Sequence, residues 1–80
     1  MAGFRTPPVY EVWWVDAVSN REWADRDVHA GQKIALTHSV GYLLARTEKE
    51  IVLVQTLNAL DQATESLSIP LCSTKRIRKR

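Results

Sequence analysis

Cysteine and glycine are scarce in this 80-residue chain. The single cysteine, Cys72, excludes a disulfide within one copy and favours a reducing compartment. Three glycines occur, and they form no glycine-rich loop of the kind that cradles phosphates. A long apolar run is also missing, and the N-terminal MAGFRTPP lacks the apolar core of a signal peptide. We therefore expect a small cytoplasmic protein that does not cross a membrane.

Charge is distributed unevenly along the chain. The net charge is +2, but the last six residues, KRIRKR, carry five of the 11 Lys and Arg residues. Residues 1–74 then hold six basic residues (11 less five) against nine acidic ones, a balance of −3. A mildly acidic body with a strongly basic end points to an anionic partner.

The first half of the chain predicts one strand followed by one short helix. Residues 1–8 include two prolines and are expected to form a flexible leader. Val9–Val18 is rich in β-branched and aromatic residues, which is typical of a strand. Ser19-Asn20-Arg21-Glu22 has the spacing of a capping box, and Gly31 can end the helix that it starts. We expect Trp23 to anchor this helix to the core.

The second half predicts a meander of short strands. Ser39–Arg46 and Ile51–Asn58 flank a polar connector and form a predicted hairpin, with a bulge or bend at Gly41. Two further strands are expected at LSIPL and at Lys75–Arg78, joined by a 3₁₀-like turn at Cys72–Thr74. Pro70 places the first of these at a sheet margin. The prediction is a mainly β protein, in which residues 9–80 form one five-stranded SH3-like or Sm-like barrel with a short helix after the first strand.

Several short motifs resemble those of a known group. They are V-x-W-x-D-A at Val12–Ala17, Trp23, SVGYLL at Ser39–Leu44, and a closing stretch with Ile69, Pro70, Arg76 and Ile77. Together they resemble small bacteriophage and prophage proteins, over roughly residues 9–78. The resemblance implies a viral protein that acts in the cytoplasm of an infected bacterium. It implies no catalytic residues.

Aromatic residues supply the first candidate site. Trp13 and Trp14 point to opposite faces of one predicted strand, so one of them is expected outside the core. Together with Tyr42, they are candidates for stacking on a ligand or for a subunit interface.

The basic end supplies the second candidate site. Lys75, Arg76 and Arg78 are predicted to hold phosphate groups, because guanidinium groups bind phosphate oxygens in a bidentate manner. Ile77 is expected to point inward between the two arginines. The alternative is a solvated edge strand whose charges prevent aggregation.

Catalytic and metal-binding signals are weak. His29 and His38 lack the spacing of a metal site, and we interpret them as surface or capping residues. Cys72 is expected to pack as a core thiol. Asp25 and Asp27 are interpreted as solvated. We therefore predict no enzyme, no cofactor and no metal.

Three functions agree with these residues. The preferred one is a phage-encoded homo-oligomer that captures a phosphate-bearing nucleotide and so sequesters a signal of host immunity, an anti-defence role. Its last step rests on the resemblance alone. The second is an Sm-like protein that binds RNA or single-stranded DNA. The third is an inhibitor that docks on a host protein.

Overall fold

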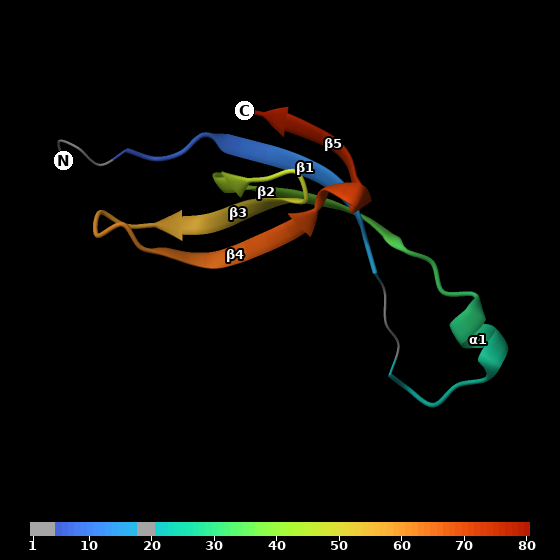
Figure 1. The fold of residues 1–80 in the computed structure, drawn as a ribbon. Helices are drawn as coiled ribbons and strands as arrows, with labels where there is room; N and C mark the ends of the chain where they lie inside the picture. The colour runs from blue at the N-terminus through green and yellow to red at the C-terminus, as the bar shows by residue number, and fades with distance from the viewer. Residues whose placement is uncertain (1–4, 18–20) are drawn as a thin grey trace.

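The computed structural model describes residues 5–17 and 21–80. The elements, in chain order, are β1 (Val9–Asp16), α1 (Arg26–Ala30), β2 (Ala35–Arg46), β3 (Glu50–Leu57), β4 (Ala63–Pro70), the 3₁₀ turn η1 (Leu71–Ser73) and β5 (Thr74–Lys79). The five strands form one open antiparallel sheet in the order β4-β3-β2-β1-β5 (Figure 1). The mainly β class, the five strands, the helix after the first strand and the 3₁₀ turn before the last one are confirmed.

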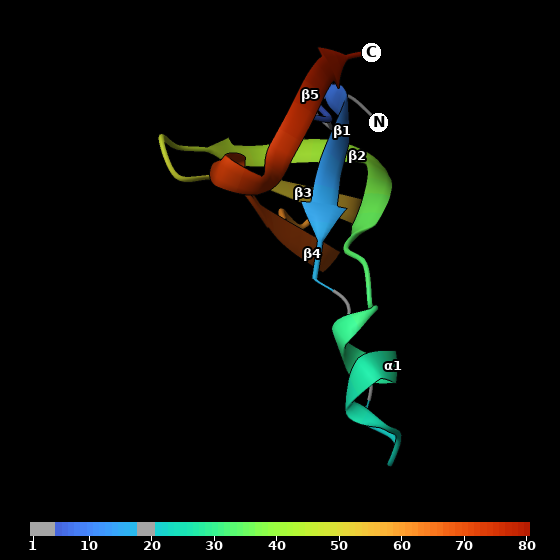
Figure 2. The ribbon, with the colours of Figure 1, turned by 90° about the vertical axis from the view of Figure 1, so that its right-hand side faces the viewer.

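The long strand β2 joins the two halves of the sheet. It pairs with β1 through residues 35–42 and with β3 through residues 42–46. Between these two stretches the strand bends, so that the β1–β5 half and the β3–β4 half lie at a steep angle to each other (Figure 2). The bend turns the same face of both halves inward.

Gly41 permits the close approach of strands at this bend. A Cβ atom at Gly41 would lie 2.9 Å from the Val54 carbonyl oxygen and 3.2 Å from the Leu53 Cβ. Of the predicted bulge or bend at Gly41, the bend is found there (Figure 2), whereas the register shift lies between Leu43 and Ala45. Gly41 is needed for the close contact between β2 and β3, and the irregular pairing follows it at residues 43–45.

The core lies between the two halves of the bent sheet. It consists of Val12 and Trp14 from β1, Ile51 and Leu53 from β3, and Ile69 from β4. Ile77 of β5 packs against this cluster, as the alternation of KRIRKR predicts. The indole Nε1–H of Trp14 donates a hydrogen bond of 3.0 Å to the Ser39 hydroxyl, so the polar end of this large side chain is satisfied.

Residues 21–34, which precede β2, extend away from the sheet as an arm that carries α1 (Figures 1 and 2). The helix ends at Gly31, as expected, but it begins at Arg26 after the N-cap Asp25 and not at the predicted capping box, since residues 21–25 are not helical. Ser19 and Asn20 of the predicted capping box lie outside the described residues. Trp23 is fully exposed, so its predicted role as a core anchor is wrong. A five-residue helix with no buried residue offers no apolar face for such an anchor.

Hydrogen bonds tie Pro8 and Arg80 to the sheet. The Pro8 carbonyl accepts from the Leu43 N–H at 2.8 Å, and the Val9 carbonyl accepts from the Arg80 N–H at 2.8 Å. The basic end is therefore a structured edge strand. Within the described residues, no helix is long and apolar enough to cross a membrane.

Candidate anion-binding face

The outer face of β1, β2 and β5 carries three of the six predicted site residues, Trp13, Arg76 and Arg78. Register places Trp13 between His38 of β2 and Arg76 of β5, and it places Glu11 between Val40 of β2 and Arg78 of β5. Because directly opposite residues of an antiparallel sheet share a face, these side chains lie on the side away from the core. We call this surface the outer face and define it by Glu11, Trp13, His38, Arg76, Arg78 and Arg80.

Trp13 is enclosed on both sides of its ring. The His38 imidazole stacks on it with 4.5 Å between ring centroids and 16° between planes. The Arg76 guanidinium carbon lies 5.0 Å from the centroid of the Trp13 ring. Since β1 lies between β2 and β5, the imidazole and the guanidinium take opposite sides of the indole. A nucleobase therefore reaches a face of Trp13 only by displacing one of these two groups.

Glu11 is the charged centre of the outer face. It is only 8% exposed, although it lies on the side away from the core. One carboxylate oxygen lies 3.3 Å from His38 Nε2, and the other lies 3.8 Å from the Nε atoms of both Arg78 and Arg80. The carboxylate thus draws Arg78 of β5 and Arg80, the residue that follows this strand, toward one point.

The arginines keep most of their donors for other partners. In both Arg78 and Arg80 the atom nearest Glu11 is Nε, and both side chains remain more than half exposed. The two ion pairs thus run through Nε, and the paired terminal nitrogens are the groups that bind phosphate oxygens in a bidentate manner. Three arginines less one carboxylate leave the outer face with a charge of +2 when His38 is neutral.

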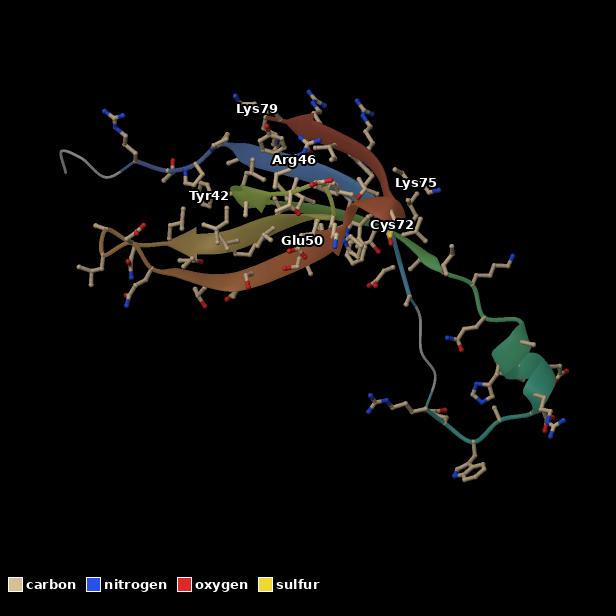
Figure 3. All side chains as sticks on the ribbon, viewed as in Figure 1. Tyr42, Arg46, Glu50, Cys72, Lys75 and Lys79 are labelled. Atoms are coloured by element: carbon tan, nitrogen blue, oxygen red, sulfur yellow. The ribbon has the colours of Figure 1, made fainter. Side chains whose placement is uncertain are left out.

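The predicted phosphate ligands separate in the structure. Arg76 and Arg78 lie together on the outer face, as expected. Lys75 is the extra residue of a β-bulge, because Trp13 pairs with Arg76 and Trp14 with Thr74. It sits at the start of β5, beside η1 (Figure 3). The third cation of the outer face is Arg80, which lies two residues after Arg78.

The predicted aromatic residues also separate. Trp14 is a core residue, so Trp13 is the tryptophan on the outside of the sheet. Tyr42 shares the face of Trp13 but lies opposite Val9 and Val54, four residues along β2 from His38. At ~3.3 Å per residue this is about 13 Å from the Trp13 stack. Tyr42 therefore belongs to the far end of the face.

Three residues of the outer face, Glu11, His38 and Arg80, are not among the site residues that the sequence predicted. Glu11 shares its strand face with Trp13 by simple alternation, and this signal is present in the sequence. His38 is different: its position beside Trp13 depends on the register of two strands joined through the arm. Periodicity within one strand carries no information about that register.

The other polar candidates lie apart from the outer face. Cys72 is exposed in η1, so the prediction of a packed core thiol is wrong. The 3₁₀ turn, which follows Pro70, carries Cys72 to the surface. Asp27 accepts the Val28 N–H at 3.0 Å, a local turn contact. Among the described residues, no three or more His, Cys, Asp or Glu side chains gather in a manner that suits a metal ion.

The geometry of the outer face suits anion binding. It carries three exposed arginines in a row, Arg76, Arg78 and Arg80. The buried carboxylate of Glu11 orients Arg78 and Arg80, and the enclosed ring of Trp13 lies against Arg76. Comparisons with protein-family models, with curated proteins and with solved structures find no match for this chain.

Proposed function

We propose that this protein is a non-catalytic binding protein that captures a phosphate-bearing nucleotide on its outer face. The observation that carries the proposal is the convergence of Arg78 and Arg80 on the buried carboxylate of Glu11 through their Nε atoms. Guanidinium groups that a carboxylate holds in place and that stay more than half exposed form a ready phosphate site at low entropic cost. No step of this proposal needs a nucleophile, a cofactor or a metal.

The base of such a nucleotide would lie on Arg76. This side chain is exposed, and its guanidinium already covers one side of Trp13. A planar guanidinium stacks on aromatic rings and on nucleobases alike. His38, Trp13 and Arg76 stack in this order, and the base would stack on the outer side of Arg76 as a fourth layer. The phosphates of the same nucleotide would then reach Arg78 and Arg80.

The wider role is part of the same proposal. The likeness to phage proteins supports, by analogy, a ligand that signals host immunity and a site of action in the cytoplasm of an infected bacterium. The bend of the sheet across β2 and the turn η1 before β5 support the SH3-like or Sm-like barrel. Oligomers of the chain would bring several outer faces together and strengthen their positive potential.

One observation favours a second function, the binding of single-stranded nucleic acid. Arg76 and Arg78 of the edge strand β5 and Arg80, which follows it, occupy alternate positions, so neighbouring members of the row are spaced by ~6.7 Å. A row of cations along an open edge can follow a chain of phosphates, and the binding of such a chain weakens steeply with salt.

Calorimetric titration tests both functions with three probes: ADP, tripolyphosphate and single-stranded oligonucleotides of increasing length. The nucleotide function predicts that ADP binds at least as well as a short oligonucleotide. The nucleic-acid function predicts an affinity that grows with oligonucleotide length and falls with salt. The absence of binding by all three probes at low salt would refute both.

The decisive variant is Arg76→Ala/Arg78→Ala. It should lose binding of the probe while keeping the circular dichroism spectrum of the parent. The matched control, Lys33→Ala/Lys49→Ala, removes the same charge from exposed residues outside the outer face and should retain binding. Equal losses in the two variants would show that only net charge matters, and that the outer face is no specific site.

A further inference from the structure

One stretch of β2 has an unused hydrogen-bonding edge. The strand pairs with β1 over residues 35–42, but its pairing with β3 begins only at Tyr42. In the part of the chain that the structure describes, residues 35–41 therefore pair with β1 on one side only. This makes a third free edge, in addition to the outer edges of β4 and β5.

The direction of the backbone groups follows from alternation along β2. The Val40 carbonyl accepts from the Gln55 side chain at 2.7 Å, so it faces β3, whereas the Leu43 N–H faces the opposite side, where it donates to Pro8. Backbone groups of an antiparallel strand point to alternate sides at successive residues. Leu36 and His38, like Val40, therefore direct their N–H and C=O groups away from β1, toward the free edge.

This edge lacks the protection that the other two edges carry. β5 is lined by Lys and Arg, and β4 ends in Pro70, both of which oppose pairing between sheet edges. Residues 35–39 read ALTHS and contain no permanent charge. Leu36 is 72% exposed and Ile34, just before the strand, is 69% exposed. An uncharged edge flanked by exposed aliphatic side chains invites a further strand.

We propose that this edge pairs with the same edge of a second copy of the chain, antiparallel and about a two-fold axis at Thr37. In this register Leu36 of each copy lies opposite the partner's His38. The N–H and C=O groups of both residues then form hydrogen bonds, four in the dimer. The two sheets become one continuous sheet.

A second copy fits this edge because the segment is complementary to itself. When two identical segments pair in antiparallel orientation, every free N–H group of Leu36 and His38 meets a free carbonyl group of the other copy. The pairing brings no like charges together while His38 is neutral. The partner's Leu36 would lie beside His38 on the outer face and lose its exposure to water. The contact is short, and interfaces below about 1,200 Å² are typically weak, so the dimer should depend on concentration.

The dimer also places two outer faces on one sheet surface, because the side chains of Leu36, His38 and Trp13 share that side. The inference does not rest on ligand binding. A chain that dimerises through β2 without binding an anion would refute the proposed function alone.

Sedimentation equilibrium of the full chain over a wide concentration range tests the interface. We expect a monomer–dimer equilibrium. Leu36→Lys places two charges beside the pairing edge and should raise the dissociation constant by at least about tenfold. The control Leu60→Lys makes the same change at a leucine of similar exposure, 79%, in the loop between β3 and β4, and should leave the constant unchanged. A parent chain that stays monomeric throughout, or equal effects of the two variants, would overturn the proposal.

Cross-linking tests the register without weakening the edge. In a Cys72→Ser background, Thr37→Cys places two thiols at the axis, in a non-hydrogen-bonded pair whose Cβ atoms are ~4.5–5.5 Å apart. Mild oxidation should link this variant rapidly into dimers. Ala35→Cys, whose two copies lie far from the axis, should react much more slowly. Equal rates for the two cysteine variants would contradict the antiparallel register about Thr37.

Discussion

The guanidinium carbon of Arg76 lies 5.0 Å from the centroid of the Trp13 ring, across the boundary between β5 and β1. This contact joins an exposed cation to an aromatic ring that lies on the outer side of the sheet between two neighbouring strands. It accounts for a partly exposed tryptophan in so small a protein, because the cation and the stacked His38 shield both faces of the indole.

Removal of the guanidinium should loosen this arrangement. We expect Arg76→Ala to lower the free energy of unfolding by about 0.5–1 kcal/mol, the value of a cation–π contact at an exposed position. The Trp13 indole Nε1–H resonance should move at the same time in NMR spectra. Arg76→Lys keeps the charge without the planar stack, so it should fall between the parent and Arg76→Ala. An unchanged Trp13 resonance in Arg76→Ala would show that the contact does not persist in solution.

Glu11 holds the arginines in place but also cancels part of their charge. Glu11→Gln removes the carboxylate and raises the charge of the outer face from +2 to +3. The amide oxygen of glutamine can still accept from the arginines and keep them in place, while one repulsive charge near the anion is lost. We therefore expect the affinity for tripolyphosphate to rise at low salt, on the order of tenfold. Stability should fall by no more than about 1 kcal/mol, since the arginine partners are largely exposed.

The control for this variant is Glu50→Gln, which removes the same charge from an exposed position at the start of β3. Its affinity for tripolyphosphate should remain close to that of the parent. If Glu11→Gln binds no better than Glu50→Gln, Arg78 and Arg80 do not form the phosphate site.

Gly41 should tolerate no side chain. An added Cβ would meet the Val54 carbonyl oxygen at 2.9 Å, which forces backbone to move. We expect Gly41→Ala to cost about 1–3 kcal/mol in urea unfolding, the usual cost of overpacking. Gly31→Ala is the matched control, because its Cβ would lie 3.4 Å from the Asp27 carbonyl at an ordinary helical φ of −80°. Equal costs for the two variants would mean that the close approach of β2 and β3 is not what requires Gly41.

Local pattern carried most of the information about the fold. Alternation in KRIRKR fixes Ile77 inward and the arginines outward, and the polar connector before Ile51 marks the hairpin of β2 and β3. Pro70 correctly indicates an edge strand, because it lacks the N–H that a central strand needs. Each of these signals depends on neighbours within a few positions.

Long-range placement could not be read in the same way. Because the arm separates β1 from β2 in the sequence, the sequence does not indicate which residue of β2 lies opposite Trp13. Only the structure shows that His38 stacks on it. The same arm misled the prediction for Trp23, because a large apolar residue is usually buried, whereas here the segment leaves the sheet. Residue type indicates how favourable burial would be, but it does not show whether the chain reaches a core.

The loop between β3 and β4 offers a test of backbone strain. Asn58 organises it: its side-chain oxygen accepts the N–H groups of Leu60 and Gln62 at 2.9 and 3.1 Å. Asp61 adopts a φ of 61°, in the left-handed region that glycine occupies without steric cost. In tight hairpin loops this position usually carries glycine.

Asp61→Gly should therefore stabilise the protein, by about 0.5 kcal/mol, once the greater freedom of glycine in the unfolded chain is subtracted from the relief of strain. Asp61→Ala is the informative comparison. It removes the same carboxylate but keeps a Cβ in the left-handed region, where alanine is less tolerated than aspartate. The free energy of unfolding in urea should thus rise for the glycine variant and fall or stay level for the alanine variant. A similar gain in both would mean that the carboxylate, rather than the backbone angle, is the unfavourable feature of the loop.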